Sequence, residues 1–410
     1  MSRKDGPGLG PARWRTQDVW AISLSAFFAD LGYQAVLAGF PLFLVLGLHQ
    51  PVLLFGVASA LSYGGGTLFS LLGGRLGDRF GHRRVALLGN SLIPLLSLSA
   101  LTTSPSVSIG LLTGGWWFRN LRSPSRRVML TEAVPDPSAR NAAFGFLHAL
   151  DVGGGALAGV WLLATVSAHL PYRWIFLATA VPLLASTLTL SRARTGRRVS
   201  RPPTAVVPGP PKPPLPGAGA LLLAAALYGF TFYAVGFPIL TVAQGGGGAV
   251  AGIGAFLLFQ AVSATTGYLL PRFLGSTLAR RFRELAWLGY GGGALGAVLL
   301  AAGYGFHLGL AVLLPGVAAL GLGLGVVETL EPSLMSFLRP GSAAGRGFGA
   351  LAAARSWGVF LGNLLMGLLY GVAPQLAYVY AAVLGAAAGA TMLAAVPRAM
   401  LSDQRLAEES

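Results

Sequence analysis

Long apolar runs, separated by short polar segments, recur along the whole chain. Each run is close to the length of about 20 residues that a helix needs to cross a bilayer. The twelve runs lie at 18–46, 51–73, 84–103, 107–129, 141–166, 172–190, 218–241, 249–271, 284–303, 308–338, 345–371 and 375–396. This pattern predicts an all-α membrane protein with twelve transmembrane helices.

The middle connection divides these helices into two groups of six. Residues 191–217 are first rich in arginine and then rich in proline, a composition that favours an extended linker over a packed core. We therefore expect an N-terminal six-helix bundle at 1–190, a linker at 191–217, a second bundle at 218–396 and a tail at 397–410. The two bundles also carry repeated sequence about 200 residues apart, which predicts pseudo-symmetry. The repeated pairs are Gly39-Phe40-Pro41 with Gly236-Phe237-Pro238, Leu76-x-x-Arg79-Phe80 with Leu278-x-x-Arg281-Phe282, and Phe144-Gly145 with Phe348-Gly349.

Positive charge alternates between successive connections. The odd-numbered connections hold almost none, with Arg173 as their cation, whereas the even-numbered connections and both termini are basic. Since positive residues are retained on the cytoplasmic side, both termini and the even-numbered connections are predicted to be cytoplasmic, in a cell's inner membrane. The net charge of +16 thus reflects membrane orientation and does not indicate a nucleic-acid partner.

Composition supports a lipid bilayer as the solvent. Charged residues make up 10% of the chain, against about 25% in soluble domains, and the mean hydropathy is +0.67. There are no cysteines, so disulfides, thiolate metal ligands and cysteine nucleophiles are excluded. The phosphate-loop, HExxH and Gly-x-Ser-x-Gly patterns are missing as well. The sequence indicates no enzyme, cofactor or metal.

One short polar segment carries a specific motif. Between the second and third apolar runs the sequence is GGRLGDRFGHRR, from Gly73 to Arg84, which predicts a loop at the membrane surface. It resembles the G-x-L-[AG]-D-R-x-G-R-[RK] loop of the major facilitator superfamily. The matching positions are Gly74, Leu76, Gly77, Asp78, Arg79, Gly81, Arg83 and Arg84. The resemblance implies two six-helix bundles that rock about a central substrate cavity near the bilayer midplane.

By the same resemblance, this loop acts as a conformational switch. The switch residues are Gly74, Asp78, Arg79, Gly81, Arg83 and Arg84. In the family the acid latches the cytoplasmic helix ends together in the outward-facing state. We expect Asp78 to contact Arg126 and Arg127, or Arg346.

Several ionisable residues lie well inside the predicted spans. Each costs about 2.5–3.5 kcal/mol on insertion scales unless it is paired or faces water. The first half has Asp30, Arg119, Arg122 and Asp151, and the second has Glu328, Glu331 and Arg355. The halves are thus charge-inverted, with arginines on the fourth helix of one and acids on the fourth helix of the other. At about ten residues, or roughly 15 Å, from the cytoplasmic ends, Arg119 is predicted to pair with Asp151 and Glu328 with Arg355.

Two interpretations of these charges remain open. They are either structural salt bridges within each half, or groups that bind a polar solute and carry a coupling proton. On the second interpretation the proton-coupling candidates are Glu328, Glu331, Asp30 and Asp151. The candidates for the substrate cavity are Tyr33, Gln34, Arg119, Arg122, His148, Tyr233, Arg355 and Trp357.

The sequence therefore favours a monomeric, proton-coupled secondary transporter that exports a small polar or amphoteric solute. Gly155-x-x-x-Gly159 resembles the fifth-helix motif of antiporters, but Val160 stands where that motif has proline. Two alternatives stay open: an uncoupled or uptake facilitator of the same fold, and a non-transporting membrane sensor or assembly protein.

Overall fold

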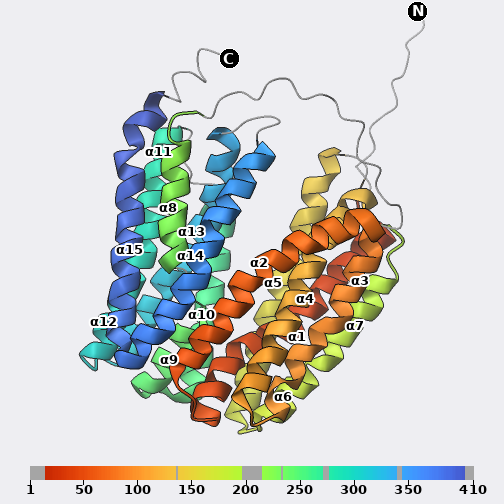
Figure 1. Cartoon of the computed structure of the whole chain (residues 1–410), viewed down its shortest axis with the longest axis horizontal. Coiled ribbons are helices and arrows are strands. Elements are labelled where there is room, and N and C mark those ends of the chain that lie inside the picture. Colours follow the sequence, from red (N-terminus) through yellow and green to blue (C-terminus); the bar gives the residue numbers. More distant parts are fainter. Residues whose placement is uncertain are drawn as a thin grey trace, which may run out of the picture.

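The computed structural model describes residues 14–134, 137–195, 215–231, 234–270, 277–338 and 344–401. Two helical bundles stand side by side (Figure 1). The first contains α1 (Gln17–Pro41) with η1 (Leu42–Gly47), α2 (Val52–Phe80), α3 (His82–Leu92) with η2 (Ile93–Leu101), α4 (Pro105–Ala133), α5 (Pro137–Ser167), α6 (Tyr172–Ala178) and α7 (Ala180–Ser191). The second contains α8 (Ala218–Thr231), α9 (Gly236–Val242) with η3 (Ala243–Gly247), α10 (Gly248–Leu269), α11 (Leu278–Glu284) with η5 (Leu285–Tyr290), α12 (Gly291–Gly305), α13 (Leu310–Leu338), α14 (Ala344–Val372) and α15 (Pro374–Ala394).

These helices confirm the predicted twelve-span membrane fold. Ten helical stretches in the described part are long and apolar enough to cross a membrane. The fourth span, α4, is not among them, because arginines and other polar residues lower its hydropathy. The seventh span is divided between α8, which is short, and α9, which joins α10 in one apolar stretch from Gly236 to Leu269.

Several helix boundaries have clear local causes. The hydroxyl of Thr16 accepts a hydrogen bond from the Val19 amide and caps α1. Three histidines, at φ of 54–56°, turn the chain in odd-numbered connections: His49, His169 and His307. This left-handed backbone conformation is the one that ends many helices, although glycine usually adopts it.

The segment between the second and third spans differs from the prediction. The expected surface loop is mostly helix, because α2 continues to Phe80 and α3 begins at His82. A single residue, Gly81, separates them, and its φ of 92° favours glycine. The stretch contains no proline, so the helix extends beyond the apolar run.

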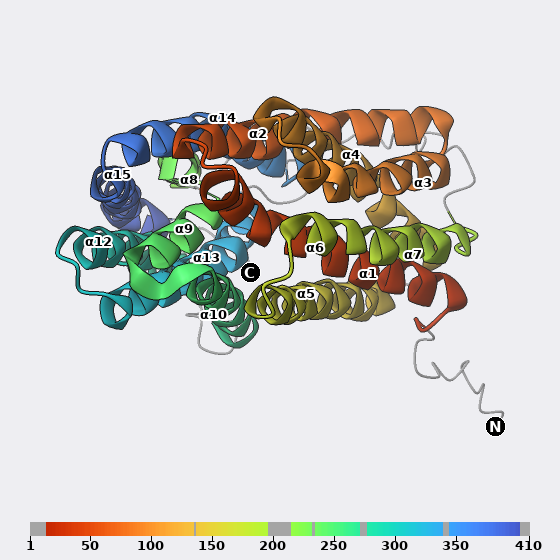
Figure 2. The ribbon, with the colours of Figure 1, turned by 90° about the horizontal axis from the view of Figure 1, so that it is seen from below.

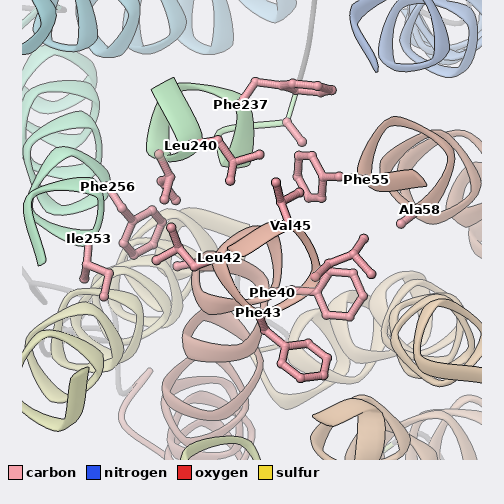
Figure 3. Close-up of a cluster of buried hydrophobic side chains, with 14 of the residues drawn as sticks. Phe40, Leu42, Phe43, Val45, Phe55, Ala58, Phe237, Leu240, Ile253 and Phe256 are labelled. Carbon is pink, nitrogen blue, oxygen red and sulfur yellow. The ribbon is translucent and has the colours of Figure 1, made fainter. Parts of the chain in front are cut away.

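An apolar seal joins the two bundles at the end where the odd-numbered connections lie. Figure 3 shows side chains of α1, η1 and α2 facing those of α9 and α10. The rings of Phe55 and Phe237 pack with their centroids 5.0 Å apart. Beside them the helix backbones nearly touch, since a Cβ atom on Gly56 would lie 2.7 Å from the Cα of Gly367. We call this region the odd-end seal.

Two helix pairs make most of the contact between the bundles. Viewed from below, α2 lies beside α14 and α5 beside α10 (Figure 2). Along α2 and α14 the contact reaches Thr67, whose hydroxyl is 3.3 Å from that of Ser356. Beyond this point the two bundles diverge toward the end that carries the even-numbered connections (Figure 1).

Candidate functional site

A cavity of about 220 Å³ lies between the two bundles. The first bundle contributes Gln34 and Leu37 of α1, Tyr63 of α2 and Trp116 of α4. The second bundle supplies the remaining wall, which includes Tyr228, Thr231, Pro238, Phe256, Phe259, Gln260, Tyr290, Leu320 and Leu324. The described residues of the lining are mostly aromatic and aliphatic. Their polar groups include hydroxyls and carboxamides, which are uncharged.

Behind the first wall lies an ionic cluster built on α1 and α4. The buried carboxylate of Asp30 accepts a hydrogen bond from the Tyr33 hydroxyl. Arg119 donates to the same hydroxyl oxygen over 3.2 Å, and its guanidinium lies 4.8 Å from the ring centroid of Trp116. Trp116 lines the cavity, so a chain of contacts runs from the cavity through Arg119 and Tyr33 to Asp30.

The predicted pair of Arg119 with Asp151 is wrong. Asp151 instead accepts two hydrogen bonds from Arg126, at 3.2 and 3.4 Å. Side chains on a helix lean toward its N-terminus, and α4 and α5 run in opposite directions. The arginine therefore leans toward the middle of the membrane and the aspartate leans away from it, which moves the pairing by seven residues, or about 10 Å.

Arg122 has no carboxylate partner in the hydrogen bonds and ion pairs of the described residues. Its side chain is fully buried, and Nη1 donates to Oδ1 of Asn90. Asn90 in turn donates to the hydroxyls of Ser186 and Thr187 over 3.0 and 2.9 Å. This polar network joins α3, α4 and α7 inside the first bundle, away from the cavity.

The second bundle holds the matching cluster with opposite charge. Glu328 pairs with Arg355 over 3.1 Å, as predicted, and Glu331 contacts the same guanidinium at 3.5 Å. The buried Glu331 also accepts a hydrogen bond of 2.7 Å from Tyr290. Arg355 lies over the ring of Tyr228 at 5.6 Å. Tyr228 and Tyr290 line the cavity, so this cluster also lies directly behind the wall.

The two clusters confirm the charge inversion between the bundles. In the first bundle Arg119 and Arg126 balance two aspartates, and the buried Arg122, which lies away from the cavity, adds one positive charge. Around the second wall one arginine meets two glutamates, an excess of one negative charge. None of these carboxylates is among the described residues that line the cavity; Glu331 is fully buried, whereas 56% of the Glu328 side-chain surface is accessible.

The residues of the switch motif have several separate contacts. Asp78 is exposed and lies 3.3 Å from His82 of the next helix, while Arg126 is paired with Asp151, so the expected contact of Asp78 with Arg126 is not formed. The side chain of Arg346 lies outside the described residues. Arg83 donates to the carbonyls of Ser191 and Ala193, and so caps the end of α7.

Glycines in and beside this motif set the approach of α2 to α4. A Cβ atom on Gly77 would meet the ring of His82 and the hydroxyl of Ser125 at 2.7 Å or less. Gly74 faces open space, so its position has room for a larger side chain. Arg79 packs against the Phe80 ring, and Arg84 is exposed.

The other cavity candidates occupy different positions. Gln34 lines the cavity and Tyr33 lies buried behind it. His148 and Trp357 are exposed and are not part of the lining, with 73% of the surface of Trp357 accessible. Tyr233 lies outside the described residues.

The sequence pattern did not identify several of the residues that line the cavity. Tyr63, Trp116 and Tyr290 were indistinguishable from aromatic residues that face lipid, since all lie in apolar runs. Gln260 had a usable signal, because it is a polar side chain inside the span 249–271. Its burial in hydrocarbon without a partner is unfavourable, which predicts a position facing a cavity.

Comparison with known proteins places these features in a family. The family model for the Major Facilitator Superfamily matches residues 22–362. The puromycin resistance protein pur8 of Streptomyces alboniger is 32% identical over 149 residues, which cover 35% of this chain. The match spans 28% of that relative's length.

Solved transporter structures have the same fold over nearly the whole chain. A bacterial homologue of the human lysosomal transporter Spinster, in an inward-facing and unoccupied conformation, superposes with a TM-score of 0.69, at 15% identity, and covers 96% of this chain and 98% of its own. The nucleoside transporter NupG gives 0.71 at 11% identity, with 94% and 99% covered. A transporter of the POT family in complex with a conjugated peptide gives 0.73 at 14% identity, with 93% and 96% covered.

Proposed function

This chain belongs to the Major Facilitator Superfamily, and from that premise we propose that it is a proton-coupled secondary transporter that exports a small molecule. It is a multi-pass membrane transporter and not an enzyme. We further propose that it acts as a monomer in a cell's inner membrane, with both termini and the even-numbered connections in the cytoplasm. The basic residues of those connections support this orientation.

One observation carries the proton coupling: two carboxylates share a single guanidinium behind the cavity wall. Arg355 can neutralise one of Glu328 and Glu331, and of the two Glu331 is fully buried whereas the Glu328 side chain is 56% exposed, so Glu331 is the acid at which an uncompensated charge would be buried. A charge in the low-dielectric interior of a membrane protein is costly, and a proton removes that cost. The 2.7 Å hydrogen bond from Tyr290 ties Glu331 to the cavity wall, so a solute that moves Tyr290 alters the environment of Glu331.

The first bundle supports the same mechanism through a second acid. One oxygen of Asp30 accepts the Tyr33 hydroxyl, and the other has no hydrogen-bond partner in the described residues. Arg119 links this acid to Trp116 at the cavity. A solute against Trp116 competes with the contact to Arg119 and thereby changes the pairing of Asp30.

Two features support export. The odd-end seal closes one side, and the bundles diverge on the side assigned to the cytoplasm, as is suitable for loading from the cell interior (Figure 1). The similarity to a puromycin resistance protein over 149 residues also favours efflux of a toxic solute. In the export cycle, protons enter from outside as the solute leaves.

The test uses purified protein in liposomes that contain a pH-sensitive dye, with puromycin and a panel of other aromatic solutes. We expect the wild type to couple proton movement to solute addition, and Glu331→Gln to abolish the coupling. Glu132→Gln, at the exposed end of α4, is the control and should behave as wild type. Coupled proton movement that persists in Glu331→Gln would contradict this assignment.

A second candidate is an uncoupled facilitator, or a non-transporting sensor of the same fold. It is favoured by the fact that the acids are paired and lie behind the wall instead of lining the cavity. In that case solute flux is either independent of a pH gradient or does not occur, and Glu331→Gln alters thermal stability without altering flux.

A further inference from the structure

We propose that Gln34 and Gln260 determine substrate specificity, by holding the amide edge of an uncharged, planar aromatic solute between the two bundles. The inference rests on the proposed transport function, because it takes the central cavity as the transport site. It adds a chemical class of solute, namely aromatic carboxamides, lactams and heteroaromatic rings with adjacent donor and acceptor atoms.

The two carboxamides come from opposite bundles and converge on one glycine. Gln34 is on α1, Gln260 is on α10, and both line the cavity. A Cβ atom on Gly155 of α5 would lie 3.6 Å from Cγ and 4.0 Å from Nε2 of Gln34. The same atom would lie 3.9 Å from Nε2 of Gln260. The two side chains therefore meet over a bare patch of α5 backbone.

The hydrogen-bonding groups of both carboxamides are available to a solute. Both side chains are half-buried, and no residue in the described part of the chain forms a hydrogen bond with either of them. A glutamine amide offers an oxygen acceptor and a nitrogen donor side by side. The complementary partner is another amide edge, which supplies a donor and an acceptor at the same spacing.

The rest of the wall selects for a ring and against a charge. Four aromatic residues line the cavity, and offset or edge-to-face packing makes contacts with an aromatic solute favourable. They are Tyr63, Trp116, Phe256 and Phe259. Among the described residues, those that line the cavity carry no ionised side chain, so a charged solute would lose its hydration without gaining an ion pair there. At about 220 Å³ the cavity lies below the usual range of about 300–1,000 Å³ for drug-sized ligands, which favours one or two fused rings.

The decisive experiment measures binding of three probes of nearly equal shape: 2-naphthamide, the 2-naphthoate anion and the 2-naphthamidine cation. Each is titrated by calorimetry into the purified full chain in lipid nanodiscs, without a pH gradient. We expect the amide to bind at least tenfold more tightly than either ion. Gln34→Leu and Gln260→Leu should each weaken the amide about five- to tenfold, the usual effect of one lost hydrogen bond.

A matched pair of glycine variants separates this effect from misfolding. Gly155→Ala adds a methyl group at ordinary contact distance, so the bundle is retained, but the methyl stands between the carboxamides. Gly153→Ala, two residues earlier on α5, meets nothing within 4 Å. We expect Gly155→Ala to weaken the amide and Gly153→Ala to leave it unchanged.

Three results would overturn the proposal: no probe binds, an ion binds as tightly as the amide, or the two glycine variants bind the amide equally. Because the assay measures affinity without a gradient, its outcome is independent of proton coupling. Loss of amide recognition with intact coupling, or the reverse, therefore identifies which of the two proposals has failed.

Discussion

The close backbone contact in the odd-end seal predicts how one added methyl group shifts the equilibrium between the conformation that is closed at the seal and the conformation that is open there. In Gly56→Ala the new Cβ atom would lie 2.7 Å from the Cα of Gly367 and 2.8 Å from the carbonyl oxygen of Asn363. Ordinary contacts are 3.4–4 Å, so α2 and α14 must separate by about 1 Å at this point. Overpacking of this kind costs about 1–3 kcal/mol, which is about a five- to 150-fold shift away from the sealed conformation.

The assay takes advantage of the absence of cysteine from the chain. Spin labels are attached at Phe80→Cys and Met400→Cys, which are exposed near the even-numbered ends of the two bundles. The distribution of distances between the labels is measured in the otherwise unchanged protein and in Gly56→Ala. We expect Gly56→Ala to populate shorter distances, since opening at the seal brings the opposite ends together.

Gly371→Ala provides the control, because a Cβ atom at that position of α14 meets nothing within 4 Å. Its distances should equal those of the parent protein. If Gly56→Ala also gives the parent distribution, while the protein stays folded, the backbone contact does not set the balance between conformations, and the reasoning is refuted.

Three further predictions concern the stability of the first bundle, measured by thermal unfolding in detergent. Asp151→Asn should lower the free energy of unfolding by about 2 kcal/mol, because it leaves Arg126 largely buried without its ion pair; an unchanged melting temperature would show that the pair is dispensable. Asn90→Leu should destabilise the bundle by about 2 kcal/mol because the fully buried Arg122 loses its hydrogen bond, and the double variant with Arg122→Met should recover most of that loss. His49→Gly should raise stability by about 1 kcal/mol, since φ is 54° there, and a decrease would mean that the imidazole itself contributes.

Most of the architecture was predictable from the sequence, because a bilayer imposes strict rules on length and polarity. The twelve apolar runs and the two-bundle division follow from those rules and agree with the family's fold. The limits of hydropathy appear at α2, which continues through Arg75 and Asp78 to Phe80. Backbone hydrogen bonding does not stop where the apolar run stops.

The site was predictable in its charges and less so in its partners. The match of Glu328 with Arg355 succeeded because the long arginine side chain reaches two acids one turn apart. The predicted pair of Arg119 with Asp151 was wrong because it was based on backbone depth alone. Side chains on two antiparallel helices lean in opposite directions, so residues at equal backbone depth do not meet. The partner of Arg119 is a tyrosine hydroxyl, and no charge pattern identifies such a group.

The wide helical turn at the end of the first span has a mechanical consequence. Because η1 is π-helical, its turn holds an additional residue compared with an α-helical turn. Passing one residue from such a turn into the neighbouring α-helix would rotate everything beyond it by about 100°. The extra residue in the wide turn therefore allows the end of the helix to rotate, so that the side chains of the seal change partners while the rest of the helix remains in place.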